Sequence, residues 1–172
     1  HVADQMGDKI TYILDGGDCE VGLESTIIKC LDDKIILLRE GKIQLEEIEA
    51  FTGIKPELTD AKSAKTEAPG MLSIHYAPNI KILVGNIPAL LETHSDKKLG
   101  ILSFSKEYKG DNVLHREVLS AKADLSEAAA NFFSALRRLD EAKVDLILAE
   151  YLPEREIGRA VNCLLYTSDA AD

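Results

Sequence analysis

The first third of the chain carries short hydrophobic runs with the length and composition of β-strands. Residues 10–14, 25–30 and 34–39 are rich in β-branched, aromatic or aliphatic side chains, and each predicts a strand. Residues 31–33 separate the second run from the third, which is typical of a tight hairpin connection. This part of the chain therefore predicts a small sheet that contains a β-hairpin.

A helical spacing follows and then gives way to a polar stretch. Leu45, Ile48 and Phe51 recur every three residues with acidic residues between them, so a short helix is predicted to end at Gly53. Residues 54–79 begin with a polar stretch that has neither the strand nor the helix period and contains prolines, which predicts a linker.

From residue 80 onward, hydrophobic runs alternate with helical spacings. Strands are predicted at residues 80–84, 99–104, 113–119 and 144–148, and helices at residues 87–94 and 125–139. Asp124 and Glu127 resemble a capping box at the start of the longer helix. Strands that alternate with helices predict a small α/β domain with a mostly parallel sheet.

Both ends of the chain look cut. No initiator methionine precedes His1, and no signal segment follows it, so we expect the chain to begin within a longer protein. Residues 154–162 predict the start of an amphipathic helix, whereas residues 163–172 show no helical period and resemble the translation of a sequencing adapter. The expected division is therefore a first domain at 1–53, a linker at 54–79, a second domain at 80–162 and a non-native tail at 163–172.

Composition places the chain among globular proteins. It has 172 residues, of which 45% are hydrophobic and 29% charged, and this balance excludes disordered, collagen-like and disulfide-rich classes. No apolar run reaches the ~18 residues that a membrane span needs. The three cysteines, Cys19, Cys30 and Cys163, have no C-x-x-C spacing, which favours a reducing, cytoplasmic setting.

Charge argues against nonspecific nucleic-acid binding. The formal net charge is −10, and residues 1–79 contain 8 basic and 15 acidic side chains. Such a surface repels a phosphate polyanion unless a local basic pocket overrides the repulsion.

A glycine-containing segment, residues 15–28, is the first candidate for a binding site. Its glycines allow backbone conformations that expose N–H groups, and Ser25 and Thr26 place two hydroxyls at the start of a strand. Such a loop can hold a carboxylate or phosphate oxygen. A plain glycine-containing loop that leads into a strand explains the same residues equally well. The segment is not a P-loop, because the Gly-Lys-Ser/Thr ending is absent.

Two further candidates carry cationic and aromatic groups. Arg39 stands at a predicted strand end beside Gly41, where its planar guanidinium can meet a phosphate, although a solvated surface arginine is the alternative. His75 and Tyr76 lie between two prolines and offer hydrogen bonding and a stacking face suited to a lid over a nucleotide. A purely structural His-Tyr pair is the alternative there.

Taken in order, these segments resemble the threonylcarbamoyl-AMP synthase family in its two-domain form. The residues that carry the resemblance are Ile13-Leu-Asp-Gly-Gly17, Gly22-Leu-Glu-Ser-Thr-Ile-Ile28, Leu38-Arg-Glu-Gly41, Ala68-Pro-Gly-Met71 with His75-Tyr-Ala-Pro78, and Ile157-Gly-Arg-Ala-Val-Asn162. The resemblance implies the C-terminal part of a YrdC-like α/β domain with a twisted sheet, then a linker with a lid motif, then a small Rossmann-like α/β domain.

The same resemblance implies an activity. The family makes threonylcarbamoyl-adenylate from L-threonine, bicarbonate and ATP, with release of pyrophosphate, for the N6-threonylcarbamoyl modification of tRNA adenosine. By this resemblance Ser25 contacts L-threonine, and Arg39, His75 and Tyr76 contact ATP. Mg²⁺ is expected with the nucleotide, and downstream tRNA-modification proteins are expected partners.

Departures from the family pattern affect these expectations. Glu40 stands where the family usually has proline, and it places a carboxylate beside a phosphate contact. Leu72, Ser73 and Ile74 replace basic and aromatic residues common in the family. The family's Lys/Arg-rich nucleotide motif belongs to an N-terminal part that this sequence lacks. The 172 residues alone are therefore predicted to be inactive.

Two alternatives compete with this interpretation. A carbamoyl-adenylate-forming domain of a hydrogenase-maturation protein shares the YrdC-like fold, but the linker motif and the domain after it argue against that enzyme. The second alternative is a non-catalytic module that binds double-stranded RNA. The acidic balance of residues 1–79 argues against it, although RNA binding by a longer protein stays open.

Overall fold

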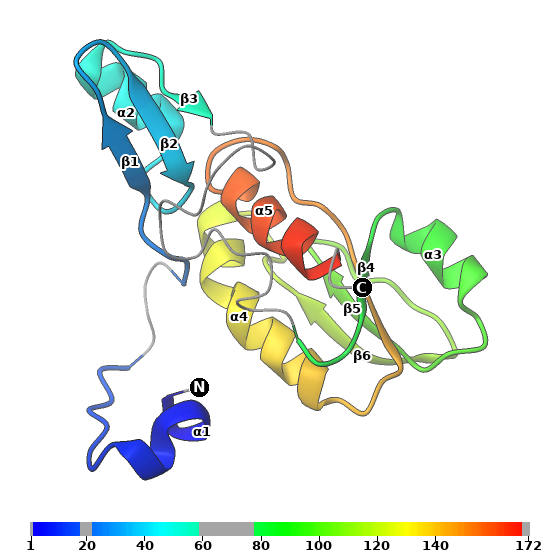
Figure 1. Cartoon of the computed structure of the whole chain (residues 1–172). Helices are drawn as coiled ribbons and strands as arrows, with labels where there is room; N and C mark the ends of the chain where they lie inside the picture. The colour runs from blue at the N-terminus through cyan, green and yellow to red at the C-terminus, as the bar shows by residue number, and fades with distance from the viewer. Residues whose placement is uncertain (1, 18–21, 59–77, 170–172) are drawn as a thin grey trace.

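The computed structural model describes residues 2–17, 22–58 and 78–169, and its strands form two separate sheets (Figure 1). A small sheet with one helix precedes a larger sheet that carries helices on both faces. The fold is the mixed α/β arrangement that the pattern of strands and helices predicts.

The small sheet is built on a hairpin. Strands β1 (Ile27–Cys30) and β2 (Ile35–Arg39) pair antiparallel, and the backbone N–H of Leu31 donates to the Lys34 oxygen at 2.9 Å to close the turn. Helix α2 (Leu45–Thr52) packs on this sheet through Ile48. The helix ends at Gly53, which takes the left-handed conformation with φ of 71°. The predicted hairpin and the predicted helix end are confirmed.

The strand predicted at residues 10–14 is absent. Helix α1 (Val2–Met6) and the 3-10 turn η1 (Gly7–Lys9) precede residues 10–14, which form no strand. Tyr12 and Leu14 are 86% and 97% exposed. A strand forms only where a neighbouring strand accepts its hydrogen bonds, and none of the described strands pairs with this segment.

The beginning of the predicted linker belongs to the small sheet. Strand β3 (Glu57–Leu58) pairs parallel with β2, and Glu57 lies opposite Ile36. The polar sequence of this segment hides the strand because β3 is a two-residue edge strand with both side chains exposed. Residues 59–77 lie outside the described part of the chain.

The larger sheet is entirely parallel. Its strands are β4 (Ile82–Val84), β5 (Leu99–Ser103), β6 (Val113–Val118) and β7 (Leu146–Ala149), in the spatial order β4-β7-β5-β6. Helix α3 (Ile87–Thr93) covers one face, and α4 (Leu125–Glu141) and α5 (Gly158–Asp169) cover the other. The predicted mostly parallel sheet is confirmed.

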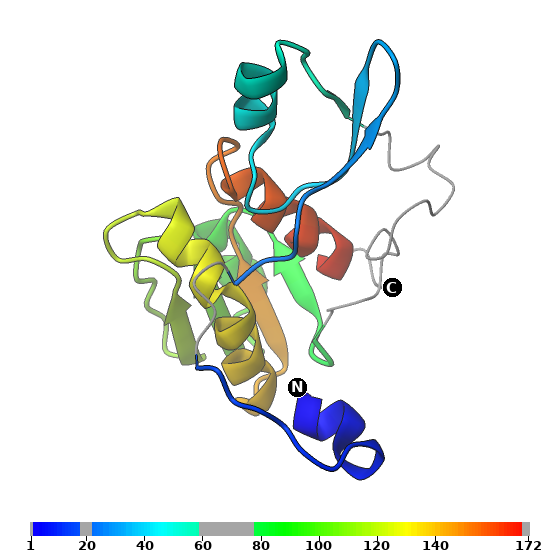
Figure 2. The ribbon, with the colours of Figure 1, turned by 90° about the vertical axis from the view of Figure 1, so that its left-hand side faces the viewer.

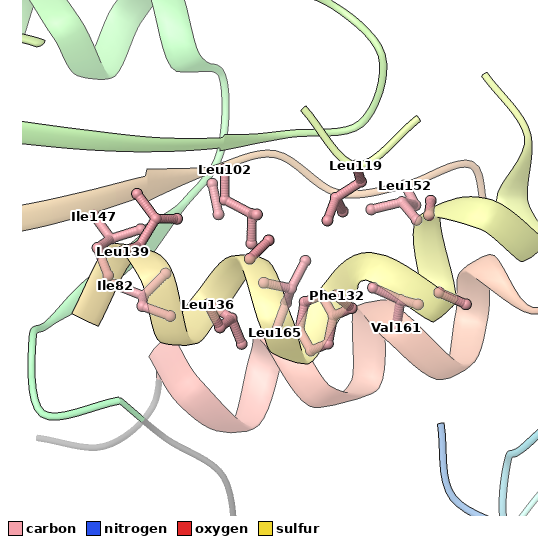
Figure 3. Close-up of a cluster of buried hydrophobic side chains, with 14 of the residues drawn as sticks. Ile82, Leu102, Leu119, Phe132, Leu136, Leu139, Ile147, Leu152, Val161 and Leu165 are labelled. Atoms are coloured by element: carbon pink, nitrogen blue, oxygen red, sulfur yellow. The ribbon is translucent and has the colours of Figure 1, made fainter. Parts of the chain in front are cut away.

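Alternation along the central strand divides the core into two layers. Leu99 and Ile101 of β5 pack toward α3, whereas Leu102 packs toward α4 and α5. Figure 3 shows the larger cluster, in which Phe132 of α4 and Leu165 of α5 lie among the buried side chains. Both of these side chains are completely buried. The two helices are therefore held to the sheet by a single hydrophobic layer.

The predicted capping box of α4 is only half formed. Asp124 Oδ1 accepts the backbone N–H of Glu127 at 2.9 Å. Glu127 does not return the contact, because its carboxylate accepts the Ser120 hydroxyl, and the Asp124 N–H donates to Ser120 Oγ at 2.9 Å. Ser120 thus takes the place that the glutamate holds in a complete box.

Helix α5 continues beyond the predicted boundary at residue 162. It runs to Asp169, and Leu165 is completely buried against α4. Val161 and Leu165 are four residues apart, which places them on one helix face. The expectation that residues 163–172 have no helical period is therefore wrong for residues 163–169, whereas their origin as adapter sequence stays a prediction.

Candidate functional site

The end of β2 and the residues before β1 bring two predicted site residues together. Ile27 lies opposite Arg39 in the antiparallel register, so Arg39 sits beside the segment that holds Ser25. Arg39 Nε donates to the Ser25 backbone oxygen at 2.9 Å, and Nη2 donates to Ser25 Oγ at 2.9 Å. Arg39 Nη1 lies 3.1 Å from Glu24 Oε2. The guanidinium therefore holds two consecutive residues at the strand end.

These contacts determine which atom Ser25 offers to a ligand. Because Ser25 Oγ accepts from Arg39, the Ser25 hydroxyl proton is oriented away from the guanidinium and serves as the donor. The Ser25 side chain is exposed, whereas the Arg39 side chain is 16% exposed. An exposed hydroxyl donor beside a cation suits a carboxylate or phosphate oxygen.

Gly41 allows the loop after β2 to approach this segment closely. A Cβ at Gly41 would collide with the backbone oxygen of Glu24 and the backbone nitrogen of Thr26, and would lie 2.6 Å from the carbonyl carbon of Ser25. The Thr26 hydroxyl donates to the Ile43 oxygen at 2.8 Å. Thr26 therefore stabilises the loop, and Ser25 is the hydroxyl that faces outward.

The loop before Ser25 packs on helix α4. This helix belongs to the unit built on the larger sheet, as the hairpin and α2 belong to the unit built on the small sheet. Gly22 has a φ of +68°, and a Cβ there would lie 2.5 Å from the Ala130 Cα of α4. Leu23 packs against the large hydrophobic cluster of α4 and α5. The glycine predicted to give this loop its conformation is thus needed for close contact with a helix more than a hundred residues away in sequence.

Arg159 of α5 contacts two carboxylates in the loop and the helix that follow Arg39. Arg159 Nη1 and Nη2 each lie 2.8 Å from an oxygen of Glu46, and Arg159 Nε lies 3.3 Å from Glu40 Oε1. Figure 2 shows the beginning of α5 below α2 and beside the loop that joins β2 to α2. The hydrogen bonds from Arg159 lower the pKa of Glu46 to about 2, and those from Glu46 raise the pKa of Arg159. This cluster joins the two units at the loop that follows Arg39.

Comparison with known proteins identifies the chain. Residues 43–164 match the family model described as threonylcarbamoyl-AMP synthase, C-terminal domain, and residues 1–41 match the model described as telomere recombination. The chain belongs to the threonylcarbamoyl-AMP synthase family. This result confirms the family that the sequence motifs indicate.

Relatives and a solved structure extend this family assignment. Threonylcarbamoyl-AMP synthases of Bacillus subtilis and Pyrococcus abyssi are 34% and 36% identical to the chain over 94% of its length. These alignments cover 49% and 50% of the relatives, so the chain spans about half the length of the curated proteins that it matches. The crystal structure of P. abyssi Sua5 in complex with L-threonine superposes on 98% of the chain and 52% of that protein, with a TM-score of 0.85 and 33% identity.

The structure describes two of the four predicted site residues, Ser25 and Arg39. Ser25 and Arg39 are in direct contact. His75 and Tyr76 lie outside the described residues, so their contact with a nucleotide stays a prediction.

In residues 2–17, 22–58 and 78–169, no group of three or more His, Cys, Asp or Glu side chains is arranged to hold a metal ion. No helix in this described part has the length and apolar character needed to cross a membrane.

Arg159 is the residue that sequence reasoning missed. It lies within Ile157-Gly-Arg-Ala-Val-Asn162, a segment that carries the family resemblance but received no role. The other five residues of the segment are buried, and the Asn162 side chain bonds to both backbone groups of Leu152. The sequence signal was a single charged residue in a segment of otherwise uncharged residues. If such a segment is buried, the charge must find a partner.

The Glu46–Arg159 pair makes stability depend on pH in the acidic range. Folding lowers the pKa of Glu46 from 4.5 to about 2, chiefly through the hydrogen bond from Arg159. A carboxylate with a lowered pKa stabilises the folded state fully above its unfolded-state pKa, and this contribution is lost as the pH falls from about 4.5 to about 2. Since the Glu46 side chain is 56% exposed, we expect at most about 1 kcal/mol.

Urea unfolding of the chain and of its Glu46→Gln variant at pH 7 and at pH 2 measures this effect. The variant is expected to be less stable at pH 7 and to approach the parent chain at pH 2. Glu49→Gln, on the same helix, is the matched control and is expected to change stability equally at both pH values. A Glu46→Gln deficit of the same size at pH 2 and pH 7 would contradict the prediction.

Proposed function

We propose that the protein to which this chain belongs is an L-threonylcarbamoyladenylate synthase. It would convert L-threonine, bicarbonate and ATP to threonylcarbamoyl-AMP and pyrophosphate, for formation of N6-threonylcarbamoyladenosine in tRNA. The observation that carries this proposal is the contact between Arg39 and Ser25, in a chain whose family membership is established. In enzyme class this is a nucleotidyltransferase.

Ser25 is proposed to contact L-threonine or its carbamoylated product. Its hydroxyl donates outward because Arg39 occupies its acceptor side, and a carboxylate is the acceptor that L-threonine provides. The P. abyssi protein, which is 33% identical to the chain, was crystallised with L-threonine. That structure supports a threonine site in this family.

Arg39 is proposed to contact the phosphates of ATP, together with His75 and Tyr76 of the lid motif. In the proposed reaction a carbamate oxygen attacks the α-phosphorus, and the bond to the bridging oxygen of pyrophosphate breaks. Negative charge spreads over the phosphate oxygens during this step, so fixed cations and N–H donors are more useful than a strong base. Arg39 is fixed at its strand end by Ser25 and Glu24, which suits such a role.

The remaining expectations belong to the same proposal. Mg²⁺ would be carried mainly by the ATP phosphates, since Mg²⁺ usually keeps several waters and takes few protein ligands. The carboxylates of Glu24 and Glu40 are both engaged by arginines, Glu24 by Arg39 and Glu40 by Arg159. Downstream tRNA-modification proteins would take up the product, and we propose a cytoplasmic location for this step.

Pyrophosphate release tests the proposal. The measurement compares the 172-residue chain with an extended protein that also contains the residues encoded upstream of residue 1. Each protein is supplied with ATP, L-threonine, bicarbonate and Mg²⁺. The extended protein is expected to release pyrophosphate only when L-threonine is present, and the chain alone is expected to release none.

Two results would contradict this proposal in different ways. Threonine-dependent release by the 172 residues alone would show that they do not need an upstream half. Salt-dependent RNA binding by the extended protein, without pyrophosphate release and unchanged by Arg39→Ala or Ser25→Ala, would favour an RNA-binding module instead.

A further inference from the structure

The loop and the helix that follow Arg39 carry two carboxylates that Arg159 binds. Glu40 follows Arg39 directly, and Glu46 lies in the first turn of α2. Carboxylates in these positions would oppose the approach of triphosphate. Both are instead bound by Arg159, which comes from α5 in the other unit of the fold.

We infer that Arg159 is a positioning residue for the nucleotide site, where it neutralises Glu40 and Glu46 and ties the loop after Arg39 to helix α5. This inference rests on the proposed function, since it concerns the same ATP site. Arg159 would touch neither ATP nor the reacting atoms. It would act through the carboxylates and through the loop that follows Arg39.

The geometry of Arg159 requires an arginine. Its two terminal nitrogens form a fork on Glu46, with both contacts at 2.8 Å, while Nε reaches Glu40 at 3.3 Å. A lysine has one ammonium group and cannot present this planar set of donors to two carboxylates. The Arg159 side chain is 25% exposed and that of Glu40 is 22% exposed, so water screens their interaction less than it screens a fully exposed pair.

The backbone of Arg159 is fixed by its neighbours. A Cβ at Gly158 would collide with the Pro153 oxygen, and the Asn162 amide bonds to the Leu152 N–H at 2.8 Å and to the Leu152 oxygen at 2.9 Å. Ile157 and Val161 are buried in the large cluster. The start of α5 is therefore a rigid support from which the Arg159 side chain extends to the loop.

Charge around Arg39 changes sharply without Arg159. Glu24, Arg39, Glu40, Glu46 and Arg159 together carry two positive and three negative charges at neutral pH. Removing Arg159 leaves one positive charge among three carboxylates. A phosphate ligand at Arg39 would then meet uncompensated negative charge, and its affinity would fall.

The affinity for ATP, measured by calorimetry on the extended protein, tests this inference. Arg159→Met is expected to weaken ATP binding about tenfold, as expected for like charges that lie close together but are screened by water. The KM for ATP is expected to rise by a similar factor, with kcat changed less than about threefold. Arg159→Lys is expected to fall between the parent protein and Arg159→Met. Arg155→Met is the matched control, because Arg155 is an exposed arginine that forms an ion pair with its exposed neighbour Glu156 at 3.0 Å.

Removal of the carboxylates separates a charge role from a purely structural role. In the Arg159→Met background, Glu40→Gln with Glu46→Gln is expected to restore ATP affinity to within about threefold of the parent protein. Weak ATP binding that persists in this triple variant would overturn the proposed neutralisation of Glu40 and Glu46. If Arg159→Met fails to fold, Arg159→Lys takes its place and is expected to weaken ATP binding less than tenfold, with Glu40→Gln and Glu46→Gln again restoring it. Normal ATP binding by the folded Arg159 variant overturns the inference.

These readouts distinguish the inference from the function on which it rests. Unchanged ATP affinity in folded Arg159→Met, with normal pyrophosphate release by the parent protein, overturns the inference alone. If the parent protein releases no pyrophosphate but binds ATP, and Arg159→Met weakens that binding, the proposed reaction is overturned and the role of Arg159 is supported.

Discussion

Arg39→Ala is expected to lower threonine-dependent pyrophosphate release by the extended protein at least about 100-fold. The substitution removes the guanidinium proposed to meet the ATP phosphates. It also removes the donor to Ser25 Oγ and the ion pair with Glu24 at 3.1 Å. The loss therefore combines weaker phosphate contact, a freely rotating Ser25 hydroxyl and the loss of the Arg39–Glu24 ion pair beside the site.

Comparison with Arg39→Lys distinguishes charge from geometry in this prediction. Lysine keeps the positive charge but cannot donate to the Ser25 oxygen and Ser25 Oγ in the same plane, so we expect it to recover only part of the activity. Arg137→Ala is the matched control, because Arg137 is a partly exposed residue of α4 that pairs with Glu141 at the i,i+4 spacing. Activity of Arg39→Ala within threefold of the parent protein would remove Arg39 from the site.

Gly41→Ala is expected to disrupt the site by steric displacement of the Ser25 segment. The new methyl group would collide with backbone atoms of Glu24 and Thr26 and lie 2.6 Å from the carbonyl carbon of Ser25. Backbone atoms cannot turn aside as a flexible side chain can, so the segment must move. We expect a loss of about 1–3 kcal/mol in stability and a loss of pyrophosphate release of at least about tenfold.

Gly7→Ala is the matched control for this substitution. A Cβ at Gly7 meets no atom within 4 Å, so the same chemical change is expected to leave stability and pyrophosphate release unaltered. Urea unfolding and the pyrophosphate assay measure both variants. Gly41→Ala with parental stability and activity would show that the loop after β2 adapts without moving Ser25.

The elements with a strong period or an apolar run could be predicted from the sequence. Helix α4 repeats its apolar residues every three or four positions along 17 residues, and its buried face follows that repeat. Strand β5 is buried at all five positions, as expected for a central parallel strand. These patterns are local, so they were visible without knowledge of the tertiary fold.

Elements that depend on a neighbour were the ones predicted incorrectly. Residues 10–14 have strand composition but pair with none of the described strands, whereas β3 has polar composition and becomes a strand because β2 lies beside it. The helical stretch after Asn162 follows the same principle, since Leu165 is held in place by α4. The secondary structure of such short segments depends more on the neighbouring strands and helices than on intrinsic propensity.

For the candidate site, the sequence by itself determined which residues could act, and only the tertiary structure decided how they are grouped. Ser25 and Arg39 were predicted one at a time, from a hydroxyl in a glycine-containing segment and from a guanidinium at a strand end, and the hairpin brings these two positions together. Arg159 contacts Glu46 across 113 residues and Glu40 across 119 residues. No periodicity or spacing encodes that contact, because it depends on how α5 packs against α4 and how the small sheet then rests on α5.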